Sequence, residues 1–441
     1  MTQQGPGREG GPPGRACAWK GARTALGQDG WGRSAGGPGA GQAAAIRERA
    51  AAQRDDVVRF LREIIAIPSP STQERAVVER VAAEMRAVGL QDVHIDPIGN
   101  VLGRVGHGPI TILYDSHLDT VGVGDPGAWE FDPYAGKVED GVVYGRGACD
   151  NKAAIACMVY AARILQELGA GDAFTLWIAG VVEEESCDGW AVGELIRTGH
   201  VRPDFVVLGE CTNLDVYRGH RGRCEIEVVT RGRSCHASAP ERGINALYKM
   251  QPLLAGIEAL GGRLKEDPFL GRGSVAATYI ECKTPSLNAV PDRCTLFVDR
   301  RMTVGETAEG AMAEIRSLPG GDSAEVRLLR YSEPSWTGYR KDVPKDFPTW
   351  VLPEEHVLVR SAVQAAAEVL GRRPAVGRWT FSTDGVSTMG QLGIPTVGFG
   401  PGEERWAHST RDQVSIEHLV AATAFYAHFP GVLAKCVGAT R

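Results

Sequence analysis

Apolar runs and segments with helical spacing alternate along residues 44–217. The strand-like apolar runs cover residues 110–115, 174–182 and 204–210. The segments with helical spacing of apolar residues cover 43–67, 151–170 and 190–199. Continuous apolar strands separated by amphipathic helices indicate a parallel sheet with helices on both faces. We therefore predict that residues 44–217 form the first part of an α/β domain.

A different pattern begins after residue 217. Strand-like, often alternating runs cover 223–232, 274–282, 294–302 and 324–332, and helical spacing covers 245–260 and 307–318. Their order, β-α-β-β-α-β, is the ferredoxin-like arrangement. From about residue 333 the first pattern returns, with a helix at 356–371 and a buried strand at 394–400. We therefore predict a ferredoxin-like α+β domain at 218–332, inserted into an α/β domain that resumes at 333–441.

Residues 1–43 are rich in glycine and proline. Such a segment buries too little apolar surface to order itself, so we predict either a disordered tail or a start codon placed too far upstream. The ten cysteines form no C-x-x-C pair, which favours reduced thiols over a disulfide framework.

The charge and hydropathy of the chain exclude some partners. A net charge of −6 gives no general attraction to nucleic acid or anionic lipid. The arginines of 217–234 are interpreted as a solvated face or an anion contact. We find neither a run of about 18 apolar residues nor an apolar export segment, and so expect a cytoplasmic protein without a membrane partner.

Side chains able to bind metal follow the predicted strands of the α/β domain. They are His117 and Asp119 after 110–115, Glu183, Glu184 and Glu185 after 174–182, Glu210 after 204–209, and His408 beyond 394–400, with Asp150 at the start of helix 151–170. In open parallel sheets, ligands bind beyond the carboxyl ends of the strands. We therefore expect these side chains to converge on one edge of the sheet.

Each of these signals has a simpler explanation when taken alone. A single His-x-Asp pair is usually structural, Asp150 alone would be a helix cap, and three glutamates usually form a solvated strand end. Together, however, so many carboxylates in one cleft would repel one another without a cation. Imidazole and carboxylate ligands without thiolates suit zinc, cobalt or manganese, and a central carboxylate suits two bridged ions. The arrangement predicts two divalent metal ions.

Longer motifs carry a resemblance to a known family. In order along residues 57–425 they are "SHLDTV", "WEFDPYAGKVEDGVVYGRGACDNK", "EEES", "GECT", "SCHASAPERGINAL", "NAVPDRC" and "WAHSTRD". The sequence resembles the M20 metallopeptidase and amidohydrolase family, which includes carboxypeptidases, aminoacylases, acetylornithine deacetylase and succinyl-diaminopimelate desuccinylase. The segments "SCHASAPERG", "DPFLGRG", "DRRMTVGET" and "FSTDGVSTMG" are most similar to its selenium-metabolism-linked hydrolase branch.

This resemblance implies a role for each candidate residue. His117 and Glu210 would bind one ion and Glu185 and His408 the other, with Asp150 bridging both. Asp119 would orient the ring of His117, and Glu184 would be the catalytic base, although three identical acids leave their register open. His236 would reach the active site of a partner subunit, which implies a homodimer formed by the inserted domain. Asn288, Arg301 and Asp384 are the candidates for substrate contacts.

The implied activity is hydrolysis of an amide bond in a small N-acyl amino acid or a related compound. Because "GECT" resembles the corresponding motif of deacylase-like members, deacylase is our first hypothesis and dipeptidase or carboxypeptidase the second. A non-catalytic metal-binding scaffold is the third. The segment "GVGDPG" is not followed by a helix, so it does not predict a dinucleotide site. Cys235 and His236 are adjacent on an extended segment and face apart, which disfavours a cysteine hydrolase.

Overall fold

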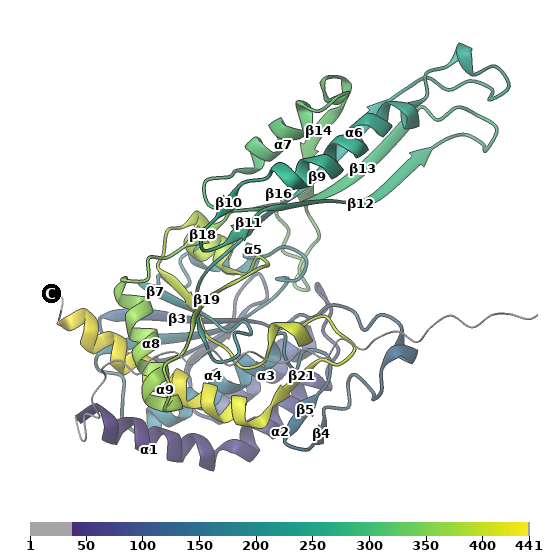
Figure 1. The fold of residues 1–441 in the computed structure, drawn as a ribbon. Helices are drawn as coiled ribbons and strands as arrows, with labels where there is room; N and C mark the ends of the chain where they lie inside the picture. The colour runs from purple at the N-terminus through teal and green to yellow at the C-terminus, as the bar shows by residue number, and fades with distance from the viewer. Residues whose placement is uncertain (1–37, 440–441) are drawn as a thin grey trace, which may run out of the picture. The chain divides into compact units, whose positions relative to one another are not determined.

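The computed structural model describes residues 38–439 (Figure 1). Residues 1–37 of the predicted tail lie outside that range. The prediction of a tail to residue 43 is wrong at its end, because helix α1 (Pro38–Ala52) already buries Ala43 and Ile46. The single helix predicted at 43–67 is two helices, since the chain leaves helical geometry at Gln53 before α2 (Arg54–Ile65) begins.

The larger sheet has nine strands in the order β1-β2-β6-β3-β7-β20-β8-β18, with β19 beside β8. The strands are β1 (Gln91–Ile95), β2 (Val101–Gly106), β3 (Ile110–His117), β6 (Phe174–Val181), β7 (Phe205–Leu208), β8 (Val216–His220), β18 (Trp350–Val351), β19 (Val376–Trp379) and β20 (Thr396–Gly398). The central pairs β6–β3, β3–β7 and β7–β20 are parallel, as predicted. Antiparallel strands flank this centre, so the complete sheet is mixed.

Helices cover both faces of this sheet. Helices α4 (Lys152–Glu167) and α9 (Ile416–Gly438) lie on one side, and α5 (Trp190–Arg197) lies on the other (Figure 1). On the α9 side, the hydroxyl of Tyr114 on β3 donates a hydrogen bond to the carbonyl of Tyr426, 2.9 Å away. Helix α9 is long and apolar enough to cross a bilayer, but 67% of its most apolar window is buried inside the protein. Its hydropathy is therefore that of a core helix.

The inserted segment forms a separate antiparallel sheet in the order β12-β13-β9-β14, and the short strand β17 (Asp346–Phe347) joins it beside β9. Its elements are β9 (Gly222–Arg231), α6 (Ala246–Leu260), β12 (Ser274–Lys283), β13 (Arg293–Met302), α7 (Ala308–Arg316) and β14 (Glu325–Leu328). This succession and strand order are those of a ferredoxin-like fold. Ile226, Leu253 and Leu296 belong to a hydrophobic core distinct from that of the larger sheet. The fold class predicted from the sequence is confirmed.

Smaller elements complete the described part of the chain. They are α3 (Arg75–Ala87), α8 (Val357–Leu370), β4 (Lys137–Glu139), β5 (Val142–Tyr144), β10 (Glu266–Asp267), β11 (Gly271–Arg272), β15 (Arg330–Tyr331), β16 (Val343–Pro344), β17 (Asp346–Phe347), β21 (Gln413–Ser415), the π-helix η5 (Val386–Gln391) and short 3-10 turns. The strand predicted at 324–332 is divided between β14 and β15 because the pairing with β9 ends at Leu328.

Candidate metal centre

Five of the predicted metal-binding residues form two triads that share one carboxylate. His117, Asp150 and Glu210 form the first, Asp150, Glu185 and His408 form the second, and the ligand atoms of each triad lie within 4.8 Å of one another. His117 Nε2 is 2.9 Å from Asp150 Oδ1 and 3.4 Å from Glu210 Oε1. His408 Nε2 is 3.0 Å from Glu185 Oε2 and 3.3 Å from Asp150 Oδ2. Asp150 thus turns one oxygen toward each triad.

The ends of three parallel strands bring these residues together. His117 is the last residue of β3, Glu185 follows β6, and Glu210 follows β7. Asp150 precedes α4, and His408 lies beyond the 3-10 turn Glu404–Trp406. Because adjacent parallel strands end at the same edge, their loops meet there. The convergence expected from the sequence is therefore present in the fold.

Burial and crowding disturb the ionisation of these groups. Burial raises the pKa of Glu210 to about 7, and burial followed by the charge of Asp150 raises the pKa of Glu185. Burial also acts to raise the pKa of Asp150, but hydrogen bonds with His117 and His408 outweigh it and hold that pKa below its usual range. A positive charge between the triads would relieve this crowding. Two sets of one imidazole and two carboxylates fit divalent zinc, cobalt or manganese.

Asp119 accepts hydrogen bonds from the loop that carries Glu183, Glu184 and Glu185. Its carboxylate oxygens accept the backbone N–H groups of Glu184 and Glu185, both at 3.1 Å, and the Ser71 hydroxyl at 2.6 Å. The Nδ1 atom of His117 lies 2.9 Å from the Asp119 backbone carbonyl and 3.5 Å from its carboxylate. Asp119 therefore contacts the ring of His117, as predicted, but its backbone carbonyl lies closer to Nδ1 than its carboxylate does.

The three glutamates point in different directions. Strand β6 ends at Val181, and Glu183 adopts a left-handed backbone conformation with φ of 59°. Its carboxylate accepts a hydrogen bond from the Tyr331 hydroxyl at 2.6 Å. Glu184 lines the pocket beside the triads, and burial followed by the charge of Asp188 raises its pKa well above the usual value. Only Glu185 belongs to a triad.

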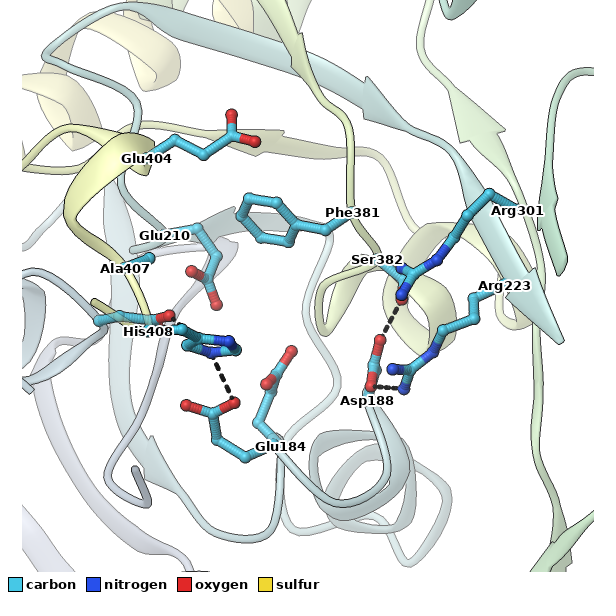
Figure 2. Close-up of a pocket in the computed structure, with 12 residues that line it drawn as sticks. Glu184, Asp188, Glu210, Arg223, Arg301, Phe381, Ser382, Glu404, Ala407 and His408 are labelled. Carbon is cyan, nitrogen blue, oxygen red and sulfur yellow. Dashed lines mark hydrogen bonds and ion pairs between the residues drawn. The ribbon is translucent and has the colours of Figure 1, made fainter. Parts of the chain in front are cut away.

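A pocket of about 300 Å³ opens beside the two triads (Figure 2). Its lining comprises Asp150, Glu184, Glu185, Asp188, Glu210, Arg223, Arg301, Phe381, Ser382, Glu404, Ala407 and His408. Figure 2 shows Arg223 and Arg301 on the opposite side of the pocket from Glu210 and His408, with Phe381 between the two sides. The pocket thus has a metal-binding side and a cationic side.

Asp188 and Ser382 were not singled out in the sequence. Asp188 accepts a hydrogen bond from Arg223 at 2.5 Å and another from the Ser382 hydroxyl. Arg223 also lies over the ring of Phe347, 4.4 Å from its centre. The arginine-rich segment 217–234 was the available signal, but it did not distinguish a solvated face from an anion contact. The Arg223 side chain is only 16% exposed, so the solvated-face interpretation fails for this residue.

Asp412 secures the loop that precedes α4. Its carboxylate accepts the backbone N–H groups of Gly147 and Cys149, both at 2.7 Å, and pairs with Arg146 at 3.1 Å. Because Cys149 immediately precedes Asp150, these bonds fix the backbone from which the shared carboxylate projects. Asp412 is fully buried, and burial raises its pKa to about 7.

The predicted substrate-contact residues lie in different places. Arg301 lines the pocket and donates two hydrogen bonds to Asp299, at 2.7 and 3.0 Å. Asp384 is buried and accepts the N–H of Gly189 at 2.7 Å, and it does not line the pocket. Its contact with substrate stays a prediction.

His236 and Asn288 are neighbours on the inserted domain. Both are exposed, the N–H of Ala237 donates to the Asn288 carbonyl at 2.8 Å, and His236 forms a β-bridge with Ala289. Neither lines the pocket of its own chain. Their predicted action at the site of a partner subunit stays a prediction.

Comparison with known proteins identifies the family. Residues 113–430 match the model of peptidase family M20/M25/M40. The chain belongs to this family. It is 47% identical over 387 residues to the uncharacterized protein YgeY of Escherichia coli (strain K12), covering 87% of this chain and 96% of that protein. It is 28% identical over 379 residues to acetylornithine deacetylase of Klebsiella pneumoniae (strain 342), covering 80% and 91% respectively.

A solved structure supports the same assignment of fold. The M20 family metallo-carboxypeptidase Sso-CP2 of Sulfolobus solfataricus superposes with a TM-score of 0.68 at 15% identity, over 86% of this chain and 99% of that one. The M20 family resemblance is therefore confirmed, and this chain is a metallohydrolase of that family whose relatives include deacylases and peptidases.

Proposed function

We propose that this protein is a two-metal amide hydrolase that removes the acyl group from a small N-acyl amino acid or a related compound. The observation that carries the proposal is Asp150, whose two oxygens face separate triads while Glu184 lines the same pocket. The relatedness to acetylornithine deacetylase supports the choice of a deacylase. The resemblance to the selenium-metabolism-linked hydrolase branch does not indicate a particular substrate.

The proposed ligands are His117 and Glu210 for one ion and Glu185 and His408 for the other, with Asp150 shared. Zinc is our first choice of metal, with cobalt or manganese as alternatives. Two such ions would supply an activated water and polarise the amide carbonyl. Glu184 then accepts the proton of the water and returns it to the leaving nitrogen. Burial raises the pKa of Glu184, which favours a carboxylate that holds the proton during turnover.

The cationic side of the pocket suits the carboxylate of an N-acyl amino acid. Arg301 and Arg223 provide guanidinium donors, which bind carboxylates with two parallel hydrogen bonds. Both arginines already have acidic neighbours, Asp299 and Asp188, which hold the guanidinium groups in place before substrate binds. Phe381 offers an apolar surface between this side and the metal centre.

The position of Glu404 in the pocket favours a second candidate function, that of a peptidase. Glu404 lines the same pocket, and its carboxylate accepts one hydrogen bond from the Thr380 hydroxyl at 2.7 Å. An anionic group here favours a substrate with a free ammonium group, such as a dipeptide. Dipeptidase or carboxypeptidase activity is therefore the alternative, and a metal-binding scaffold without catalysis is a third hypothesis.

We also propose a cytoplasmic homodimer joined through the inserted domain. Strand β12 is an edge strand, and exposed apolar side chains lie on it and on α6, with Tyr279 60% and Tyr248 72% exposed. Edge strands with apolar surface are suited to pairing with another chain. In such a dimer, His236 would donate a hydrogen bond to the tetrahedral oxyanion in the partner's site, with Asn288 beside it.

Metal-loaded protein should be assayed against paired substrates that differ in one group. N-acetyl and N-succinyl amino acids test the deacylase proposal, and dipeptides with the same carboxyl-terminal residue test the alternative. The proposal predicts faster turnover of the acylated compounds, with loss of activity when the substrate carboxylate is amidated. Faster turnover of the dipeptides would favour the alternative, and no hydrolysis of either by metal-replete protein would favour the scaffold.

A further inference from the structure

Two cysteines of the inserted domain face each other across neighbouring strands. Cys282 on β12 is paired in register with Cys294 on β13. Their Sγ atoms are 3.0 Å apart, and both thiols are free. Directly opposed residues of antiparallel strands have Cα atoms about 4.5 to 5.5 Å apart. That separation lies within the range that a disulfide spans, about 4.4 to 6.8 Å.

The two thiols differ in accessibility. Cys294 is fully buried in the core beneath α6, whereas Cys282 is exposed on the edge strand. Burial and the neighbouring Cys282 raise the pKa of Cys294 to about 12. In a chain whose strand β12 is not covered by a partner subunit, a reagent in solution meets Cys282 first, and Cys294, with its sulfur 3.0 Å away, is the resolving thiol.

We propose that Cys282 and Cys294 are a reversible oxidation site that takes a small disulfide of the glutathione type and closes a disulfide across β12 and β13. This inference goes beyond the proposed hydrolase function and does not depend on it.

The exchange proceeds in two balanced steps. The Cys282 thiolate attacks one sulfur of the small disulfide, forms a mixed disulfide and releases one small thiolate. Cys294 then loses its proton and attacks the Cys282 sulfur, which releases the second small thiolate. The protein gives up two electrons and two protons, and the small disulfide becomes two thiols.

Six other cysteines within residues 38–439 lack this combination. Five of them are buried, namely Cys149, Cys157, Cys187, Cys211 and Cys224. Cys235 is partly exposed, and its thiol contacts the backbone carbonyl oxygen of Ala239. At Cys282 and Cys294, in contrast, an exposed thiol meets a buried one.

The position of the pair gives the bond a structural consequence. It lies at the base of the segment 284–292, which joins β12 to β13 and contains Asn288. That segment is hydrogen-bonded to the loop bearing His236 through Ala237 and Asn288. A covalent bond at its base removes conformational freedom from the segment that presents both exposed residues.

Peptide mapping tests the proposal on the full chain without any substrate. The protein is incubated with reduced or oxidised glutathione, its remaining thiols are blocked, and it is digested with trypsin without reduction. The oxidised sample should yield peptide 273–283 joined to peptide 294–300, with the loss of two hydrogen atoms, and the reduced sample should yield both separately. Amide hydrogen exchange within 284–292 should be slower after oxidation.

Single variants separate the two steps. In Cys294→Ser protein, Cys282 should keep one glutathionyl group because no resolving thiol remains. In Cys282→Ser protein the linked peptide should disappear, whereas the matched control Cys436→Ser should retain it. Free Cys282 and Cys294 in oxidised wild-type protein, or a Cys294→Ser protein without the glutathionyl group, would overturn the proposal.

Discussion

The candidate residues at the edge of the larger sheet differ in burial and in contacts from those on the inserted domain. At the sheet edge, the triad residues contact one another within a single chain, and all of them except the exposed His408 are buried or partly buried, as is Glu184. On the inserted domain, His236 and Asn288 are exposed and make only local contacts. The difference teaches that strand ends and adjoining loops of one chain bring together the residues proposed to bind metal. The residues proposed to act in trans do not line the pocket of their own chain.

The largest effect is expected at the sheet edge, from Glu184→Gln. The variant should keep both ions but lose about three orders of magnitude in kcat, because an amide cannot shuttle the proton. Glu183→Gln is the matched control and should be much milder, since Glu183 bonds to Tyr331 away from the pocket. Bound metal and turnover are measured for both. A metal-replete, inactive Glu183→Gln enzyme would instead make Glu183 the base.

The second prediction tests the inserted domain. His236→Ala should lower kcat by about two orders of magnitude, as expected for removal of one oxyanion donor. Mixing His236→Ala chains with Glu184→Gln chains should restore activity, because each hybrid dimer contains one site with both groups intact. Activity of the mixture is compared with each variant alone. No recovery in verified hybrid dimers, or a fully active wild-type monomer by light scattering, would contradict action in trans.

Substitution of Asp412, which holds the loop before α4, should have a smaller effect than substitution of the proposed base Glu184. Asp412→Asn leaves a backbone N–H of Gly147 or Cys149 without its acceptor and removes the charge partner of Arg146. Loss of such support should weaken metal binding by about 10-fold. Competition with a chelator measures the affinity. Asp342→Asn, which disturbs only an exposed pair with Arg330, is the control and should bind metal like the wild type.

The smallest expected effect is on the pH dependence of the free energy of unfolding. His220 is fully buried, and burial lowers its pKa to about 3 from the usual 6.5. Between these values the unfolded chain binds a proton that the folded chain does not. The free energy of unfolding should therefore fall as the pH drops below 6.5, by about 1.4 kcal/mol per pH unit from this group. Denaturation of His220→Gln protein between pH 6.5 and 4.5 should show a flatter pH dependence than wild type, and equal slopes would refute the assignment.

The sequence was sufficient for the central fold and the triads because both follow from local patterns. Buried parallel strands are continuous apolar runs, and an acid or imidazole directly after such a strand reaches the shared edge. The antiparallel flanks were not predicted, since β2 and β8 are short and include glycine and arginine. Local periodicity carries no information about how such strands pair.

The cationic side of the pocket could not be predicted in full for a related reason. Asp188 meets Arg223 across 35 positions and Ser382 across 194, so both contacts depend on the tertiary fold. Arg301 was named through the family resemblance, whereas its neighbour Arg300 is buried and pairs with Glu306.

Metal analysis of Asp150→Asn beside Glu185→Gln and Glu210→Gln tests the shared carboxylate most directly. Wild-type protein should contain close to two divalent ions per chain and lose amide hydrolysis on chelation until zinc, cobalt or manganese is returned. Each glutamate variant should weaken mainly one ion, with activity partly rescued by excess metal, whereas Asp150→Asn should weaken both. Full activity after verified metal removal, or loss of a single ion from Asp150→Asn protein, would contradict the account.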